Sequence, residues 1–347
     1  MKTSYFHGKR ILVTGATGSI GSEIVAQLLA DGPAVVRLFS RDEHKQFQMQ
    51  HRTGEDARLR YLLGDVRDLP RLTSAFEGID LVFHCAAYKH VPFCEYNSFE
   101  AVKTNVVGTQ NVIEAALHQN VERVLLVSTD KAASPGSVMG ATKLLAEKLV
   151  TSAMQSKGNH RTLFSSVRFG NVIGSRGSVI PTFISQIRAG GPVTITDPEM
   201  TRFFLSIPKA VDLTFRAMQQ MQNGELFILK MPVMRLGDLV DVLIEEVAKR
   251  EGIDPKKIQK RVTGSRPGER MHESLMTREE GLYATETDDM FIVQSPLRGP
   301  GEPEADLRTN ADAREYSSQG QKVLSPNEIR TLICAFLESS SAVNLNA

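Results

Sequence analysis

A glycine-rich turn near the amino terminus constrains the fold of this chain more than any other feature. The apolar run at residues 9–13 is followed at once by Thr14-Gly15-Ala16-Thr17-Gly18-Ser19-Ile20-Gly21, and residues 22–30 then have helical periodicity. Glycines at this spacing permit a tight turn, close approach of a pyrophosphate to the backbone, and close packing of the helix on the strand. The N-terminus of the helix attracts phosphates through its dipole and its N–H groups. We therefore predict a dinucleotide site that contains Gly15, Thr17, Gly18, Ser19, Ile20 and Gly21, the alternative being a glycine turn without a ligand.

Apolar runs alternate with helical periodicity after this turn. Strands are predicted at residues 34–39, 59–63, 81–85, 124–127 and 163–169. This alternation predicts an α/β fold with a Rossmann-like doubly wound parallel sheet in residues 1–170, to which some later segments return. A smaller C-terminal α/β substrate-binding lobe is expected mainly in residues 171–338. We predict a long surface loop at residues 295–321, a last helix that ends near residue 338, and a disordered tail at residues 339–347.

The ends of the second to fourth predicted strands supply further cofactor contacts. Ser40 and Arg41 stand where an NAD enzyme usually places a carboxylate for the ribose 2′-hydroxyl. A hydroxyl and a guanidinium, joined by Lys45, suit a 2′-phosphate, so NADP is favoured over NAD. The alternative is that Arg41 pairs with nearby acids while Asp42 binds the ribose. The following strand ends add four predicted contacts, which are Asp65, Val66, Ala86 and Ala87.

Ionisable and hydroxyl groups gather after the apolar run at residues 124–127. The sequence there is Ser128-Thr129-Asp130-Lys131, and open α/β sheets bind ligands at the carboxyl ends of their strands. Met139 and Lys143 are four residues apart, so a helix that begins near residue 138 places both on one face. We interpret this stretch as the active site. The alternative is a polar loop in which Asp130 and Lys131 merely pair at the surface.

Charge and cysteine content exclude several classes of protein. The chain has 41 Lys plus Arg against 40 Asp plus Glu, which gives no electrostatic case for a nucleic-acid or anionic-membrane surface. Its three cysteines lack the spacing of a metal site and suggest reduced thiols. Without a signal peptide or an 18-residue apolar span, a soluble cytoplasmic protein is expected. His84 and the methionines Met218, Met221, Met231 and Met234 are predicted to be core residues.

These segments together resemble the extended short-chain dehydrogenase/reductases. Within them the chain is similar to the UDP-N-acetylglucosamine 4,6-dehydratases of bacterial polysaccharide and glycoprotein sugar pathways, over residues 9–338. The motifs that carry this similarity are Phe39-Ser40-Arg41-Asp42-Glu43, Ala87-Tyr88-Lys89-His90-Val91-Pro92, Thr129-Asp130-Lys131-Ala132, Asn171-Val172-Ile173-Gly174-Ser175-Arg176-Gly177-Ser178-Val179 and Arg266-Pro267-Gly268-Glu269. The guanidinium groups of Arg202 and Arg266 suit a diphosphate, with surface ion pairing as the alternative. The predicted substrate contacts are Lys89, Asn171, Ser178, Val179, Arg202, Arg266 and Glu269.

The resemblance implies NADP-dependent dehydration of UDP-N-acetylglucosamine to a UDP-4-keto-6-deoxy-N-acetylhexosamine. The steps are oxidation at C4, loss of water across C5–C6 and hydride return to C6. Thr129 would act at O4, Asp130 as the acid at O6 and Lys131 as the base at C5, while Lys143 holds the nicotinamide ribose.

One residue departs from the superfamily pattern. Met139 stands where a catalytic tyrosine is usual, and a thioether cannot accept the proton of the C4 hydroxyl. The change is compatible with catalysis if Asp130, a lysine or a water accepts that proton. A UDP-sugar 4-epimerase and, from another class, a catalytically silent NADP-binding protein are the alternatives. A homo-oligomer is expected by analogy with family members.

Overall fold

The computed structural model describes residues 4–222, 224–265, 268–295 and 313–344. The chain divides into two compact units, each assembled from separate segments. Unit 1 comprises Met1–Arg168, Val211–Lys230 and Leu275–Glu315, and unit 2 comprises Phe169–Ala210, Met231–Ser274 and Tyr316–Ala347. Later segments of the chain thus belong to the same unit as the amino-terminal part.

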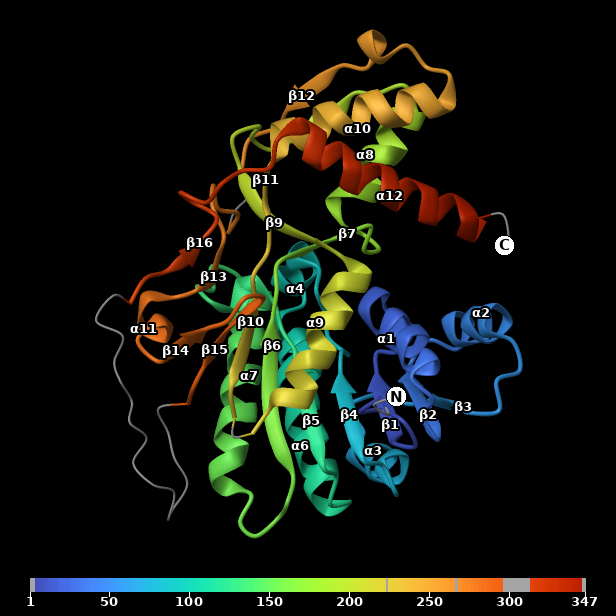
Figure 1. The fold of residues 1–347 in the computed structure, drawn as a ribbon, viewed down its shortest axis with the longest axis vertical. Helices are drawn as coiled ribbons and strands as arrows, with labels where there is room; N and C mark the ends of the chain where they lie inside the picture. Colours follow the sequence, from blue (N-terminus) through green and yellow to red (C-terminus); the bar gives the residue numbers. More distant parts are fainter. Residues whose placement is uncertain (1–3, 223, 266–267, 296–312, 345–347) are drawn as a thin grey trace. The chain divides into compact units, whose positions relative to one another are not determined.

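Unit 1 is built on one sheet in which nine strands pair among the described residues (Figure 1). The strand order is β14-β15-β10-β6-β5-β4-β1-β2-β3, with parallel pairing from β10 to β3 and antiparallel pairing of β14 and β15 at one edge. The strands are β1 (Arg10–Thr14), β2 (Val35–Ser40), β3 (Leu59–Leu63), β4 (Leu81–His84), β5 (Arg123–Val127), β6 (Leu163–Arg168), β10 (Leu226–Leu229), β14 (Ala284–Glu286) and β15 (Met290–Val293). The order reverses between β1 and β4, which is where doubly wound sheets bind ligands. The predicted Rossmann-like sheet is confirmed.

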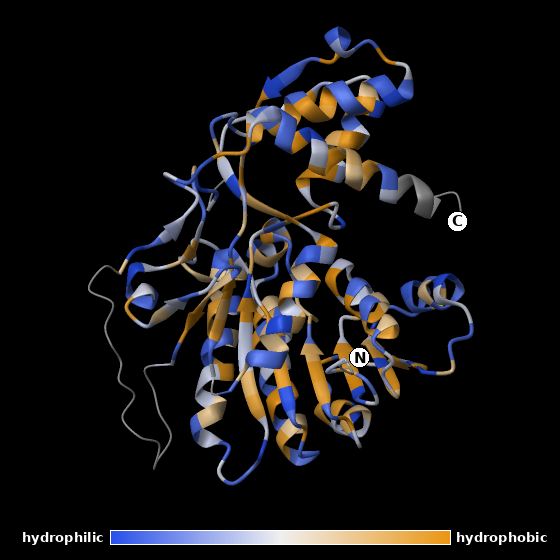
Figure 2. Cartoon of the chain, viewed as in Figure 1, coloured by the Kyte–Doolittle hydropathy of each residue, from blue (hydrophilic) through white to orange (hydrophobic). Residues whose placement is uncertain are grey.

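Helices cover both faces of this sheet. The helices that lie wholly or mostly in unit 1 are α1 (Ser19–Ala30), α2 (Glu43–Thr53), α3 (Leu69–Phe76), α4 (Val91–Tyr96), α5 (Ser98–Ala101), α6 (Gly108–His118), α7 (Val138–Ser156), α9 (Ile207–Gln220) and α11 (Arg278–Gly281). Helices α3, α6 and α7 bury apolar residues against one face. On the other face the rings of Phe6, Phe83 and Phe215 lie 4.6–6.1 Å apart. Figure 2 shows apolar residues concentrated in the strands, so burial of apolar surface holds the layers together.

The segment between α5 and α6 departs from α-helical geometry. Between α5 and α6 the backbone forms a π-helix, η1 (Val102–Val107). Wider turns of this kind are rare and are often found at functional sites. The π-helix contains Thr104 and Asn105, both of which are buried.

Unit 2 holds smaller sheets and three long helices. Strands β7 (Asn171–Ile173), β9 (Thr201–Ser206) and β11 (Val233–Arg235) form one sheet, and β8 (Val193–Ile195) pairs with β12 (Lys260–Val262). The helices α8 (Val179–Arg188), α10 (Leu236–Glu251) and α12 (Pro326–Asn344) enclose an apolar core. The short elements are η3 (Pro255–Lys257), β13 (Ser274–Met276), which crosses the boundary between the units, and β16 (Tyr316–Ser317).

Helix α12 extends beyond the predicted end near residue 338. In the structure it continues to Asn344, whereas the sequence led us to expect a disordered tail from residue 339. The reason is that no glycine or proline follows Glu338 to stop the helix.

Within the described residues, no helix is both long and apolar enough to cross a lipid bilayer.

Candidate active site

The glycine turn after β1 approaches the loop that follows β4 closely. Gly15 has φ +64°, and a Cβ at this position would lie 2.8 Å from the backbone nitrogen of Ala86. A Cβ on Gly21 would lie 2.4 Å from the carbonyl oxygen of Gly15. Side chains do not tolerate such distances, so this path of the backbone requires glycine at both positions. Helix α1 then begins at Ser19 with Gly18 as its N-cap, an arrangement that presents backbone N–H groups suited to phosphates.

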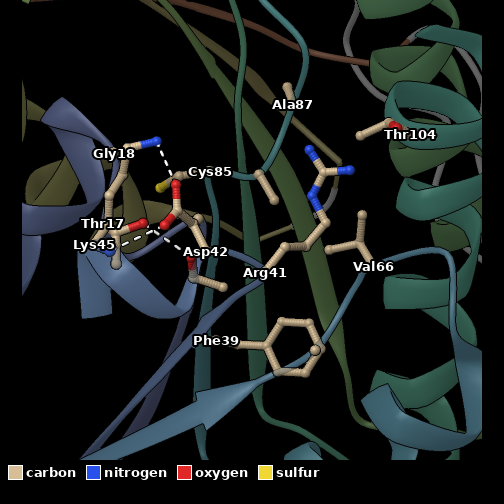
Figure 3. A pocket seen from close by; sticks show the side chains of 14 residues that line it. Thr17, Gly18, Phe39, Arg41, Asp42, Lys45, Val66, Cys85, Ala87 and Thr104 are labelled. Carbon is tan, nitrogen blue, oxygen red and sulfur yellow. Dashed lines mark hydrogen bonds and ion pairs between the residues drawn. The ribbon is translucent and has the colours of Figure 1, made fainter. Parts of the chain in front are cut away.

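A cavity of about 270 Å³ lies beside this turn (Figure 3). The side chain of Thr104 lines it although the sequence did not single Thr104 out. Its hydroxyl is buried and has no hydrogen-bond partner within the described part of the chain, which fits a polar group of a ligand. The predicted cofactor residues that line the cavity are Gly15, Thr17, Gly18, Ser40, Arg41, Lys45, Val66, Ala86 and Ala87.

Asp42, which the alternative interpretation assigned to the ribose, contacts Lys45 in the structure. Its carboxylate accepts hydrogen bonds from the Lys45 backbone N–H (3.0 Å) and pairs with Lys45 Nζ (2.6 Å). These contacts with Lys45 hold the pKa of Asp42 below its usual range. Asp42 therefore serves as the N-cap of α2. The hydroxyl groups of Ser40 and Thr17 lie 2.9 Å apart at the cavity.

Arg41 contacts an acid, as the alternative interpretation expected, but that acid has another partner. Arg41 Nη1 lies 3.4 Å from Asp65 Oδ2, whereas Arg67 donates to the same oxygen from Nη2 at 2.7 Å and from Nε at 3.0 Å. Burial works to raise the pKa of Asp65, but the Arg67 hydrogen bonds outweigh it and the pKa is lowered. The closer partner of Arg41 is the hydroxyl of Tyr88, at 3.0 Å.

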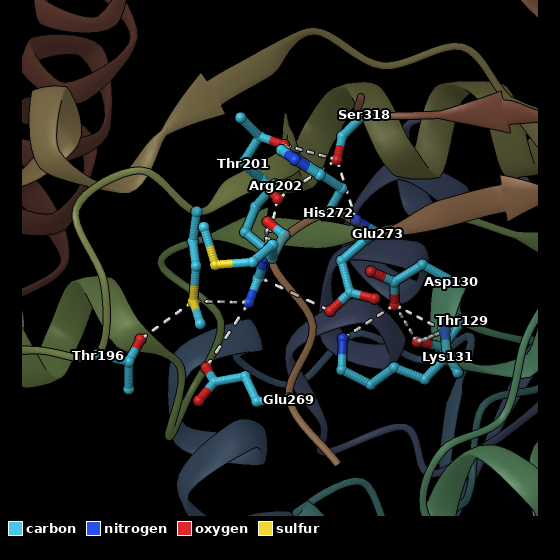
Figure 4. Close-up of polar contacts among 12 residues, drawn as sticks. Thr129, Asp130, Lys131, Thr196, Thr201, Arg202, Glu269, His272, Glu273 and Ser318 are labelled. Carbon is cyan, nitrogen blue, oxygen red and sulfur yellow. Dashed lines mark hydrogen bonds and ion pairs between the residues drawn. The ribbon is translucent and has the colours of Figure 1, made fainter. Parts of the chain in front are cut away.

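The predicted catalytic residues after β5 form a compact cluster (Figure 4). They lie on and before the short helix η2 (Asp130–Ala132). One carboxylate oxygen, Asp130 Oδ1, accepts from Thr129 Oγ1 (2.7 Å), from the Lys131 backbone N–H (2.9 Å) and from Lys131 Nζ (3.1 Å). The other oxygen, Oδ2, is buried and has no hydrogen-bond partner among the described residues. Since Asp130 is only 2% exposed, this is not the surface pairing of the alternative interpretation.

Helix α7 carries Lys143, whose ammonium contacts the last residue of β5. Ser137 caps the helix by accepting from the Gly140 N–H at 3.2 Å. Lys143 Nζ donates to the carbonyl oxygen of Val127 at 2.8 Å. Burial lowers the pKa of Lys143 to about 8, although Glu147 opposes this shift. Met139 lies one turn earlier on α7 and is 3% exposed.

Asn105 is a residue that the sequence interpretation missed. Its side chain accepts from the Tyr88 N–H (2.8 Å) and donates to the Tyr88 carbonyl (3.0 Å). It also donates to Thr142 Oγ1 at 3.0 Å, so it connects the loop after β4 to the helix that carries Lys143. The sequence offers one indication of this role, which is that Asn105 is a polar amide among the apolar residues of a helical segment.

Arg168, at the end of β6, is the second feature that was missed. It is fully buried and donates to both carboxylate oxygens of Glu147 (3.1 and 2.5 Å) and of Glu280 (2.9 Å each). Burial alone would raise the pKa of Glu280, but Arg168 outweighs it and the pKa is lowered. Glu147 follows Lys143 by one helical turn, so these charges adjoin the predicted active site.

The predicted core residues are buried. His84 Nδ1 lies 2.7 Å from Thr14 Oγ1, and its Nε2 lies 3.1 Å from Thr109 Oγ1. Desolvation lowers the pKa of His84 to about 3, so the ring is neutral. The four methionines named above are also buried.

In the described ranges no group of three or more His, Cys, Asp or Glu side chains could hold a metal ion.

The predicted substrate residues fall in both units. Lys89 is exposed on the loop after β4 in unit 1. In unit 2, Asn171 Oδ1 on β7 and Ser178 Oγ, at the N-cap of α8, are buried without a hydrogen-bond partner in the part of the chain that the structure describes. Val179 is the first residue of α8. Arg266 lies outside the described residues.

Arg202 lies on β9 and is 7% exposed, so it is not a surface ion pair. It donates to the carbonyl oxygens of Thr201 (2.9 Å) and Met271 (3.1 Å). Its guanidinium lies 3.7 Å from Glu269 and 3.6 Å from Glu273 (Figure 4). The structure thus places two predicted substrate residues, Arg202 and Glu269, close together, and a role for Arg202 at a diphosphate stays a prediction.

Three features define an extended short-chain dehydrogenase/reductase. They are the doubly wound sheet, the glycine turn where its strand order reverses, and the buried Lys143 on α7. A family model described as "Polysaccharide biosynthesis protein" matches residues 11–295, and the chain belongs to this family.

Similar proteins carry several names. An uncharacterized membrane protein of Methanocaldococcus jannaschii is 51% identical, over 84% of this chain and 87% of the relative. An inverting UDP-N-acetylglucosamine 4,6-dehydratase of Campylobacter jejuni is 39% identical, over 92% and 91%. A UDP-glucose 4-epimerase of Rickettsia rickettsii is 36% identical, over 94% and 96%. Among solved structures, Pen from Bacillus thuringiensis is 49% identical with a TM-score of 0.89, over 96% of this chain and 99% of Pen.

Proposed function

We propose that this protein is an NADP-dependent dehydratase that converts UDP-N-acetylglucosamine to a UDP-4-keto-6-deoxy-N-acetylhexosamine for bacterial surface polysaccharide or glycan synthesis. The relatives support the broader class, a nucleotide-sugar 4,6-dehydratase within a family that also includes 4-epimerases. The choice of dehydration rests mainly on the contact between Asp130 and Lys131.

Dehydration needs a base at C5 and an acid at O6, and the Asp130–Lys131 pair can supply both. With Lys131 Nζ 3.1 Å from Asp130 Oδ1, one proton can pass from the ammonium to the carboxylate. The products of that transfer, an amine and a carboxylic acid, carry the same net charge as the ion pair. The amine is the required base, and Oδ2 of Asp130, which has no partner in the described chain, is the oxygen suited to deliver a proton to O6.

The cavity beside the glycine turn fits a dinucleotide, since Gly15 and Gly21 leave no room for side chains where the backbone must meet a pyrophosphate. Arg41, Lys45 and Ser40 supply a cationic and polar end for a 2′-phosphate. NADP held there would supply the hydride acceptor for oxidation at C4 of the sugar and the hydride donor for C6.

The remaining residues serve the sugar and its proton. Lys143 holds the nicotinamide ribose through its ammonium. Thr129 Oγ1, which already donates to Asp130 at 2.7 Å, takes the O4 proton and relays it to water, because Asp130 already carries the proton from Lys131. The tyrosine absent at Met139 is then not required. Asn171, Ser178 and the other predicted contacts of unit 2 bind the UDP-sugar. A homo-oligomer and a cytoplasmic location are part of this proposal.

The deciding experiment mixes purified protein with NADP and UDP-N-acetylglucosamine and follows the sugar nucleotide by mass spectrometry and by proton NMR, which reports the configuration at C4. Loss of one water supports dehydration. A product of unchanged mass with inverted C4 supports the 4-epimerase, which needs no acid and base at C5 and C6. An unchanged substrate supports the silent NADP-binding protein.

Variants of the acid and base test the mechanism. Lys131→Ala should abolish both dehydration and solvent deuterium exchange at C5. Asp130→Asn should still permit C4 oxidation but block loss of water, so that a 4-keto sugar and reduced nicotinamide accumulate together. A Lys131→Ala protein that forms product at the normal rate would remove Lys131 from the mechanism.

A further inference from the structure

The guanidinium of Arg41, which we assign to the 2′-phosphate, also contacts an aromatic side chain. Arg41 Nη1 donates to Tyr88 OH at 3.0 Å, and its Cζ lies 5.1 Å from the centroid of the Tyr88 ring, within the range of a cation–π contact. The Asp65 carboxylate is farther, at 3.4 Å, and is shared with Arg67. Tyr88 is thus the nearer anchor of Arg41.

Both contacts are made by the Nη1 group of the Arg41 guanidinium. The Nε and Nη2 groups on its other edge stay available for a ligand. Within the described chain, the hydrogen-bond partners of Arg41 all contact Nη1. The Nε and Nη2 donors form the edge that binds two oxygens of a phosphate. Figure 3 shows the guanidinium projecting among the residues that line the cavity, near Ala87 and Val66.

Tyr88 is itself held on two sides. Asn105 hydrogen-bonds both its backbone N–H and its carbonyl. Its side chain packs against the apolar cluster formed by Cys94, Ala101 and Met139. Arg41 is partly exposed and has a long side chain, so without a fixed neighbour it would sample many rotamers. A tyrosine held in this way can limit those rotamers before a ligand arrives.

We propose that Tyr88 is a positioning residue that sets the cofactor preference, by holding Arg41 with its Nε–Nη2 edge toward the 2′-phosphate. The inference rests on the proposed use of NADP. Met139 contributes to the apolar cluster against which Tyr88 packs.

The test compares dissociation constants of NADP and NAD for the full-length protein and three variants. Tyr88→Phe keeps the ring and its packing but removes the hydroxyl, and should weaken NADP roughly tenfold, the usual scale for a hydrogen bond to a charged group, while NAD binding changes little. Tyr88→Leu removes the ring as well and should weaken NADP further. Arg41→Ala should show the largest selective loss of NADP. In the Arg41→Ala background, Tyr88→Phe should have almost no additional effect on NADP, because its partner is gone.

The outcomes separate this inference from the function on which it rests. If Arg41→Ala is selective for NADP but Tyr88→Phe weakens NADP and NAD equally, Tyr88 has only a structural role and the inference fails while the NADP assignment stands. If Arg41→Ala weakens both cofactors equally, the assignment of the 2′-phosphate to Arg41 is wrong and the inference falls with it.

Discussion

Replacing Arg168 by leucine should destabilise unit 1 strongly. The guanidinium is fully buried between Glu147 and Glu280 and also donates to the Leu275 carbonyl at 2.9 Å. Removing one partner from a buried ion pair costs about 3–5 kcal/mol, because the remaining charge stays buried without compensation. For a domain of 150–250 residues this corresponds to a decrease in melting temperature of about 6–20 °C. Thermal unfolding at about pH 8, followed by calorimetry, measures it.

The pH dependence of the Arg168→Leu protein provides a second readout. In the wild type the pKa of Glu280 is lowered, so this interaction contributes stability above the unfolded pKa of glutamate and loses it as the pH falls through the lower folded pKa. Without Arg168, burial is expected to raise the pKa of Glu280 instead. As the pH falls, the folded variant would then bind a proton before the unfolded chain does. The difference in free energy of unfolding between variant and wild type should therefore narrow from about pH 8 to about pH 5.

A matched control is available on α9. Arg216 pairs with Asp212 and Asp289, but its side chain is 44% exposed. Arg216→Leu should therefore cost no more than about 1 kcal/mol. The neutral triple variant Arg168→Met, Glu147→Gln and Glu280→Gln should recover part of the stability that Arg168→Leu loses. The reasoning is refuted if Arg168→Leu melts as close to wild type as Arg216→Leu does, or if the gap widens at low pH.

Two further predictions concern α7. Because burial lowers the pKa of Lys143 to about 8, its ammonium should be lost as the pH rises through that value, so NADP affinity should fall above about pH 8. Titration calorimetry across this range measures the effect, and Lys143→Met should show weak binding without that pH dependence; a wild-type affinity that stays constant would contradict the assigned role. Met139→Leu should keep turnover within roughly tenfold, since a swap of similar volume usually costs under about 1.5 kcal/mol. A dead Met139→Leu protein beside a strongly activated Met139→Tyr protein would mean that the tyrosine function is missing, and the silent-binder interpretation would replace ours.

The features that the sequence by itself determined are local. The glycine turn after β1 could be predicted because Gly15, Gly18 and Gly21 act within one strand, turn and helix. Thr129, Asp130 and Lys131 could be placed at the end of a buried strand because apolar periodicity marks β5. The common helix face of Met139 and Lys143 follows from 3.6 residues per turn. The parallel sheet itself follows from the alternation of such elements.

The pairing of side chains across elements was decided only by the tertiary structure. Apolar patterns predict that a segment is buried but not which neighbour it meets, so nothing in the sequence linked Arg168 to Glu147 and Glu280, which are 21 and 112 residues away. The bonds from Asn105 to Tyr88 depend in the same way on a π-helical turn that periodicity does not reveal. The asymmetry of Asp130, with one saturated and one open oxygen, exists only once β5, η2 and their neighbours are folded together, because hydrogen-bond satisfaction is a property of the three-dimensional surroundings.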